Sequence, residues 1–266
     1  MDLKKTITYN TVPLVYRVSG EGTPVMLVHG FGEDGKVWKE QAPALEKQFQ
    51  VIIPDLPGSG DSALLPGGNI GISDYAGALK AILDTEGIGS CIMLGPSMGG
   101  YTPLAFAEQY PRMLTGFGLV HSSAYADSDE KKNTREKAIG FMEKNGAAAF
   151  LATSIPGLFG PEFTEAHPDR IEELVEQGSS FTAEALVQYY RAMINRPDRT
   201  HILRSTGLPV LFILGVHDKA VPFEQGLQQC YLPARSHVHI LRHSAHMGMW
   251  EEAAVTTKAI LSFLSA

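Results

Sequence analysis

The sequence predicts an α/β fold built on a mainly parallel sheet. Short apolar runs rich in β-branched residues alternate with longer segments of helical period. These runs are nearly continuous, which is typical of strands that are covered on both faces. Between residues 125 and about 200 the strand rhythm stops, and only helical patterns follow.

The apolar runs define eight strands. A short turn joins the first two runs, residues 7–9 and 14–18, and we expect them to form an antiparallel hairpin at one edge of the sheet. The other strands are expected, in chain order, at residues 24–30, 50–55, 90–95, 116–121, 208–215 and 237–241.

Three helices are expected to cover this sheet. Ser73 precedes a segment with one apolar face, and Gly87 lies beyond its end, which predicts a capped crossover helix. The apolar face of that segment consists of Tyr75, Leu79, Ile82 and Leu83. Residues 99–110 and 251–264 show similar patterns.

The helical block predicts an insertion over one end of the sheet. It contains helical patterns at residues 130–144, 170–177 and 182–194. The chain therefore divides into residues 1–124 and 201–266, which form the sheet-containing core, and residues 125–200, which form a helical cap.

Composition favours chemistry on small molecules. The 22 basic and 29 acidic side chains give a net charge of −7, with no Lys/Arg-rich run to bind nucleic acid or an anionic membrane. The N-terminus lacks a signal-peptide core, and no apolar stretch approaches the ~20 residues that span a bilayer, so we expect a cytoplasmic protein. Cys91 and Cys230 match no metal spacing and are expected to be buried thiols. The sequence does not specify an oligomeric state.

The segment LGPSMGGY, residues 94–101, contains the candidate nucleophile. Gly95, Ser97 and Gly99 fit the pattern G-x-S-x-G. A glycine-rich chain can produce this pattern by chance, but here it follows a predicted strand and opens a predicted helix, the context of a nucleophile elbow. Such a turn strains the serine backbone by roughly 1–3 kcal/mol and needs small neighbours.

A serine hydroxyl needs a base and an acid, which should also lie at the carboxyl ends of strands. Asp218 follows the strand at 208–215 and is the candidate acid. Both His243 and His246 follow the last strand, so these residues alone leave the base open between them. The other histidines near these strands, His217, His237 and His239, are expected to lie in a loop or to be structural or solvated.

Acyl transfer also needs two N–H donors for the developing oxyanion. The amide of Met98, at the start of the predicted helix, is one candidate. The other is the amide of Phe31 in HGFG, residues 29–32. His29 in the same motif is expected to order the loop through hydrogen bonds.

Together these segments resemble the α/β-hydrolase fold superfamily. The chain order Ser97, Asp218, His246 fits, as do HGFG, PDLPGSGDS at 54–62 and HMGMWE at 246–251. The resemblance implies an eight-stranded, mostly parallel sheet with a cap over the active site, and it favours His246 as the base. Pro96 departs from related sequences, which usually carry a side chain with an N–H there. Members that open epoxides or displace halide use aspartate at the elbow, so Ser97 argues against both reactions.

The resemblance implies a serine hydrolase of small carboxylic esters that needs no metal or organic cofactor. The same triad also suits hydrolytic cleavage of carbon–carbon bonds, perhydrolysis of the haloperoxidase-like kind, or a slow receptor-like member that mainly binds ligand. We expect a largely apolar pocket. Its expected walls are Trp38, Met98, Phe141, Phe159, Tyr190 and Met193.

Overall fold

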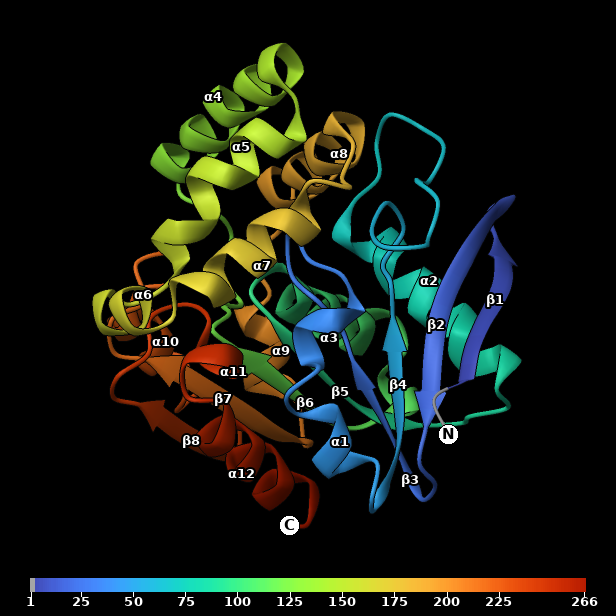
Figure 1. Ribbon diagram of the computed structural model, residues 1–266. Helices are drawn as coiled ribbons and strands as arrows, with labels where there is room; N and C mark the ends of the chain where they lie inside the picture. The colour runs from blue at the N-terminus through green and yellow to red at the C-terminus, as the bar shows by residue number, and fades with distance from the viewer. Residues whose placement is uncertain (1–2) are drawn as a thin grey trace.

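The computed structural model describes residues 3–266 and contains one eight-stranded sheet (Figure 1). The strand order is β1-β2-β4-β3-β5-β6-β7-β8. The strands are β1 (Leu3–Tyr9), β2 (Val12–Ser19), β3 (Thr23–Leu27), β4 (Phe49–Pro54), β5 (Cys91–Pro96), β6 (Leu114–Val120), β7 (Pro209–Gly215) and β8 (Arg235–Leu241). This arrangement confirms the predicted eight-stranded, mostly parallel sheet.

Strand β2 runs antiparallel to both of its neighbours. It pairs antiparallel with β1 and with β4, while all pairs from β4 to β8 are parallel. The predicted edge hairpin is therefore present. Asn10 and Thr11, at the turn between β1 and β2, both take positive φ angles, as a tight hairpin turn requires.

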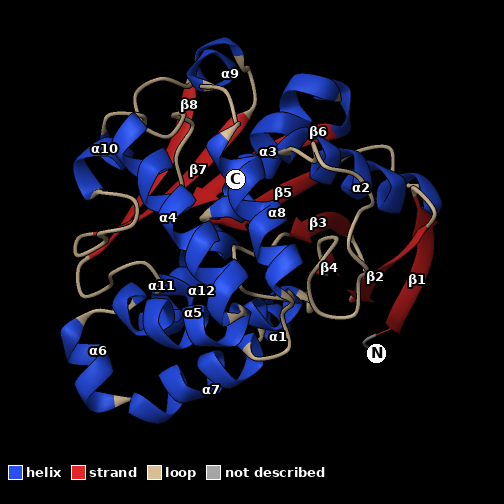
Figure 2. Ribbon diagram, turned by 90° about the horizontal axis from the view of Figure 1, so that it is seen from above, coloured by secondary structure: helices blue, strands red, loops and turns tan. Residues whose placement is uncertain are grey.

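Helices cover both faces of the sheet, as the continuous apolar strands require (Figure 2). On one face, α2 (Ile72–Thr85) packs against α3 (Met98–Gln109), which contacts β5 and β6. On the other face, α1 (Ala42–Leu45) contacts α12 (Ala253–Leu264), which packs on β7 and β8. Cys91 and Cys230 are buried free thiols, as expected.

The cap of α2 differs from the prediction. Ser73 lies inside the helix, and Gly71 occupies the N-cap position. The Asp74 carboxylate accepts a hydrogen bond of 2.8 Å from the Gly71 amide, which is the contact that the third helical residue makes back to the N-cap in a capping box. Gly87 follows the helix with a φ of 67°.

Between β6 and β7 the described chain forms helices and loops but no strand. The helices are α4 (Asp129–Asn145), α5 (Ala147–Ser154), α6 (Pro161–Ala166), α7 (Pro168–Gly178), α8 (Ala183–Ile194) and α9 (Thr200–Ser205). Of these, α4, α5 and α8 lie at the top of Figure 1, and α9 lies lower, beside α3. Two short helices, α10 (Phe223–Leu227) and α11 (Gly248–Glu251), flank β8, and single 3-10 turns lie at Gly35–Trp38, Pro111–Met113 and Ile155–Leu158. Among residues 3–266, no helix combines the length and apolar character needed to cross a membrane.

Candidate active site

Ser97 lies in a strained turn between β5 and α3. Its φ of 50° and ψ of −121° fall outside the regions that a serine normally adopts, which costs about 1–3 kcal/mol. Hydrogen bonds hold the turn in place: the Ser97 amide donates to Val120 O at 2.9 Å, and Ser97 O accepts from the Ser122 hydroxyl at 2.6 Å. The neighbouring strand β6 therefore fixes the conformation of the elbow.

Glycines allow α3 to begin so close to the sheet. A Cβ atom on Gly95 would lie 2.2 Å from Gly99 O, and one on Gly99 would lie 2.4 Å from His29 O. Both neighbours are backbone atoms, which cannot rotate away. The G-x-S-x-G spacing is thus a packing requirement of this turn.

Asp218 and His246 meet at the carboxyl ends of β7 and β8. His246 Nδ1 lies 2.8 Å from Asp218 Oδ2, and Asp218 Oδ1 accepts hydrogen bonds from the Ala220 and Val221 amides at 2.9 and 2.8 Å. Burial acts to raise the pKa of Asp218, but the neighbouring His246 and His121 rings hold it below its usual value. Burial acts to lower the pKa of His246, and the Asp218 carboxylate outweighs it, so the pKa is raised. The carboxylate favours the charged form of the imidazole.

Ser97 and His246 line the same cavity, of about 290 Å³. In the described chain the two side chains form no direct hydrogen bond, as is common in catalytic sites without substrate. Asp218 contacts Nδ1 of the imidazole. Among residues 3–266, no group forms a hydrogen bond with Nε2.

The loop after β3 contributes Phe31 to this cavity. Within the described chain, neither the Phe31 nor the Met98 amide donates a hydrogen bond to another group. His29 orders the loop, as expected: its Nε2 accepts from the Leu56 amide at 2.8 Å, and its Nδ1 lies 2.8 Å from Gly30 O. His29 is fully buried and does not line the cavity.

The remaining histidines lie away from the cavity. The His243 side chain is 72% exposed and faces Glu162, and His217 is exposed as well. His237 and His239 lie on β8, where the His237 ring packs against Phe263.

Tyr190 and Met193 line the cavity, but the other expected wall residues do not. Trp38 is completely buried, and its indole N–H donates to Val28 O at 3.0 Å. Phe141 is 41% exposed and its ring contacts that of Phe150 at 6.3 Å, and Phe159 stacks on Phe163 at 5.3 Å. The expectation for these three was wrong, because each side chain meets other parts of the chain and none lines the cavity. Met98, also expected as a wall, is buried and contributes no side chain to the cavity.

Two buried residues of the site were missed by sequence reasoning. His121 directly follows β6, and its Nδ1 lies 3.4 Å from the Asp218 Oδ2 that His246 also contacts. Its place at the end of a strand is the sequence signal that could have identified it.

Among residues 3–266, His121, Asp218 and His246 are the one group whose ligand atoms, all within 4.8 Å of one another, could surround a metal ion. His246 hydrogen-bonds the shared carboxylate, whereas neither ring nitrogen of His121 has a hydrogen-bond partner among residues 3–266.

Glu33 is the other missed residue. It follows HGFG directly, and its Oε2 accepts a 2.8 Å hydrogen bond from the Gly30 amide. The side chain lines the cavity beside Ser97 and His246. Burial raises the pKa of this carboxyl to about 7.

A family model described as alpha/beta hydrolase fold matches residues 23–253. The chain belongs to the alpha/beta-hydrolase fold family. It is 30% identical to a thermophilic esterase from Thermogutta terrifontis, solved with malate bound, and the two structures match with a TM-score of 0.92 over 100% of this chain and 98% of the other.

Two curated relatives extend the comparison. The chain is 24% identical to a 2-hydroxy-6-oxononadienedioate/2-hydroxy-6-oxononatrienedioate hydrolase from Pseudomonas sp, over 93% of this chain and 90% of the relative. It is 28% identical to the dihydrolipoyllysine-residue acetyltransferase component of an acetoin cleaving system from Pseudomonas putida, and the match covers 94% of this chain but only 65% of that protein. Family membership and the hydrolase relatives identify the chain as a hydrolase that acts on small molecules.

The elbow glycines give the first testable prediction. Gly95→Ala should lower the free energy of unfolding by at least about 1–3 kcal/mol, because the added methyl group meets backbone atoms. Gly89→Ala is the matched control, since nothing lies within 4 Å of the position of its Cβ. Urea unfolding of both variants measures the difference, and equal stability of the two would contradict the packing account.

Glu33 gives a prediction for the pH dependence of stability. Its folded pKa of about 7 exceeds the ordinary value of 4.5, so its cost to stability is absent below about pH 4.5, grows as pH rises, and is complete above about pH 7. The free energy of unfolding of Glu33→Gln, relative to that of wild type, should therefore rise by about 1–3 kcal/mol between pH 4.5 and pH 8. Urea unfolding at both pH values tests this, with exposed Glu21→Gln as control. A Glu33→Gln difference that does not vary with pH would refute the assignment.

Proposed function

We propose that the chain hydrolyses small carboxylic esters through a triad of Ser97, His246 and Asp218. The observation that carries this proposal is the 2.8 Å contact between Asp218 and His246 beside the cavity that Ser97 also lines. The Asp218 carboxylate accepts a hydrogen bond from Nδ1–H, which leaves Nε2 of the imidazole free to act as a base. The strained turn supports the proposal, because it presents the serine hydroxyl where α3 begins.

The reaction would proceed through an acyl-enzyme. His246 Nε2 takes the hydroxyl proton as Ser97 Oγ attacks the ester carbonyl, and the amides of Phe31 and Met98 stabilise the resulting oxyanion. The tetrahedral intermediate collapses, and His246 returns the proton to the departing alcohol. Water then attacks the acyl-enzyme with the same base, which releases the carboxylic acid and restores the Ser97 hydroxyl.

The helical block would act as a cap that limits substrate size. Residues of α4 and α8 form part of the cavity wall above Ser97, and the cavity of about 290 Å³ suits a short ester. The Thermogutta esterase, which matches this chain over its whole length, supports an esterase activity. We retain residues 125–200 as the proposed extent of the cap.

Hydrolytic cleavage of a carbon–carbon bond is the second candidate. The Pseudomonas hydrolase of 2-hydroxy-6-oxononadienedioate, matched over nearly its full length, favours it. Such a reaction would use the same Ser97, His246 and Asp218. A protein that fails to hydrolyse simple esters but cleaves a vinylogous diketone would favour this candidate over the esterase.

Ester turnover tests the proposal directly. Wild type should hydrolyse 4-nitrophenyl acetate and butyrate, and Ser97→Ala or His246→Ala should each lower kcat by about 10³-fold or more, because nucleophile and base act as one unit. His243→Ala is the matched control, since that side chain is exposed and lies outside the cavity. An undiminished rate in His246→Ala would refute the assigned base.

A further inference from the structure

One face of α4 places two cations in the wall of the catalytic cavity. Lys131, Thr134, Arg135 and Ala138 all line the cavity that contains Ser97. Their spacing of i, i+3, i+4 and i+7 puts them on the same side of the helix. The triad mechanism uses neither cation. An uncharged short ester would need only an apolar wall there, so the two cations call for another explanation.

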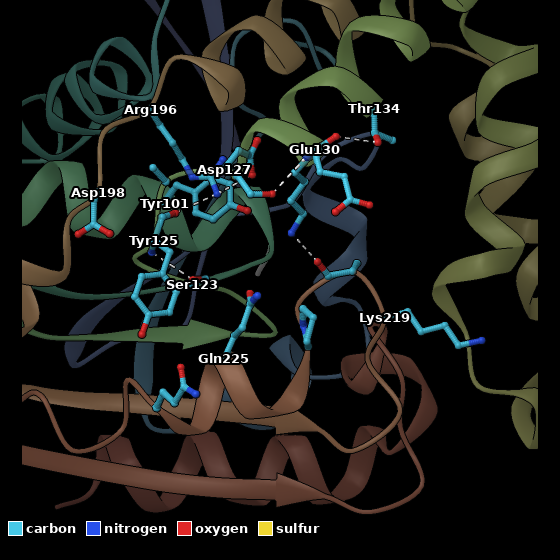
Figure 3. A pocket seen from close by; sticks show the side chains of 16 residues that line it. Tyr101, Ser123, Tyr125, Asp127, Glu130, Thr134, Arg196, Asp198, Lys219 and Gln225 are labelled. Carbon is cyan, nitrogen blue, oxygen red and sulfur yellow. Dashed lines mark hydrogen bonds and ion pairs between the residues drawn. The ribbon is translucent and has the colours of Figure 1, made fainter.

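Arg135 belongs to a group with more positive than negative charge. Its Nε donates to Asp127 Oδ2 at 2.8 Å, and Arg196 lies 3.0 Å from the other oxygen of the same carboxylate. Figure 3 shows Arg196 directed toward Asp127. The Asp127 side chain is fully buried, so one carboxylate compensates two guanidinium groups in a region with little water. One positive charge remains uncompensated by this carboxylate.

Lys131 adds a second positive charge to the same cavity wall. Its Nζ donates to Ala220 O at 2.8 Å, and within residues 3–266 it forms no ion pair with a carboxylate. The charge of Lys131 acts to lower the pKa of His246, although the Asp218 carboxylate outweighs it. Lys131 also lines an adjoining outer cavity of about 670 Å³.

Opposing charges lie around these cations. Glu33 faces the catalytic cavity, and its pKa of about 7 leaves it only partly charged near neutral pH. Glu130 and Asp198 line the outer cavity instead. Lys219 is a third cation that lines both cavities, and its ammonium points away from the outer cavity in Figure 3. The wall beside Ser97 therefore keeps a surplus of positive charge from Lys131 and Arg135.

We propose that the substrate carries a carboxylate besides its scissile ester, and that Lys131 and Arg135 bind this second group. The inference rests on the esterase activity proposed above. A guanidinium and an ammonium on one helix face supply the charge-assisted donors that a carboxylate accepts. The cavity of about 290 Å³ has room for a compact substrate of this kind, such as a half-ester of a short dicarboxylic acid.

Paired esters test this inference. The acyl arm compares mono-4-nitrophenyl glutarate with uncharged 4-nitrophenyl pentanoate, and the alcohol arm compares 4-acetoxybenzoate with 4-methylphenyl acetate. After subtraction of the non-enzymatic rate, kcat/KM for the charged ester should exceed that for its neutral partner in at least one arm. The favoured arm identifies the side of the ester that carries the carboxylate. Equal values, or a preference for the neutral ester in both arms, would overturn the inference.

Variants of Lys131 assign the preference to this wall. Lys131→Gln keeps a donor for Ala220 O but removes the charge, and should lower the ratio of charged to neutral kcat/KM by about tenfold. Lys131→Arg should restore most of the ratio. Lys132→Gln is the control, because it makes the same charge change at a neighbouring α4 position outside both cavities. An unchanged ratio in Lys131→Gln would refute the role of Lys131.

Two outcomes separate this inference from the proposed function. If wild type hydrolyses none of the four esters, the proposed esterase fails and takes the inference with it. If it hydrolyses the neutral esters without preferring either charged partner, the esterase stands and the carboxylate site fails.

A second measurement on wild type uses salt. Added salt should reduce the ratio of charged to neutral kcat/KM, because screening weakens the attraction of the two cations for the substrate carboxylate. A ratio that does not change with salt would contradict the electrostatic origin.

Discussion

The proposed active site depends on how closely α3 approaches the sheet at its first turn. The α3 backbone begins so near β5 and the β3 loop that Gly95 and Gly99 have no room for a Cβ atom, and Ser97 is held at a φ of 50°. Packing of α3 against β5 and β6 must balance this strain. As a result, Ser97 and the start of α3 lie at the carboxyl edge of the sheet. The loops that follow β3, β7 and β8 reach the same edge.

A single buried carboxylate organises the other half of the site. Asp218 is fixed by two backbone amides through Oδ1, so Oδ2 is left for the imidazoles of His246 and His121. A carboxylate with this many partners stays ionised despite its burial, which keeps the pKa of His246 raised. The site thus combines a fixed negative charge below the imidazole with positive charges on α4 above the cavity.

The sequence predicted the fold well, and the same local patterns point to the proposed reactive residues. Continuous apolar strands specify a covered parallel sheet, and Gly95, Ser97 and Gly99 specify a strand-to-helix turn. Strand ends share one edge, so Asp218 and His246 could be expected near Ser97 before their contact was visible. The family resemblance then chose His246 over His243, and the exposed position of His243 agrees with that choice.

The composition of the pocket could not be predicted in the same way. The sequence shows that Phe141 and Phe159 are apolar, but which neighbour each side chain meets depends on how α4 to α8 pack together. Trp38 was expected as a wall of the apolar pocket, yet its indole N–H donates to Val28 O in the core. Glu33, Lys131 and Arg135 resemble ordinary surface charges in the sequence. Only the tertiary arrangement places them beside Ser97.

Covalent labelling measures the central claim most directly. Treatment with a fluorophosphonate, followed by digestion and mass spectrometry, should give one adduct per chain, located on the Ser97 oxygen. Denatured protein should give none, because the elbow and the Asp218-supported imidazole exist only in the fold. An adduct on a different residue, or an unlabelled native protein, would contradict the account. An adduct at Ser97 without hydrolysis of simple esters would leave the nucleophile in place and favour carbon–carbon cleavage.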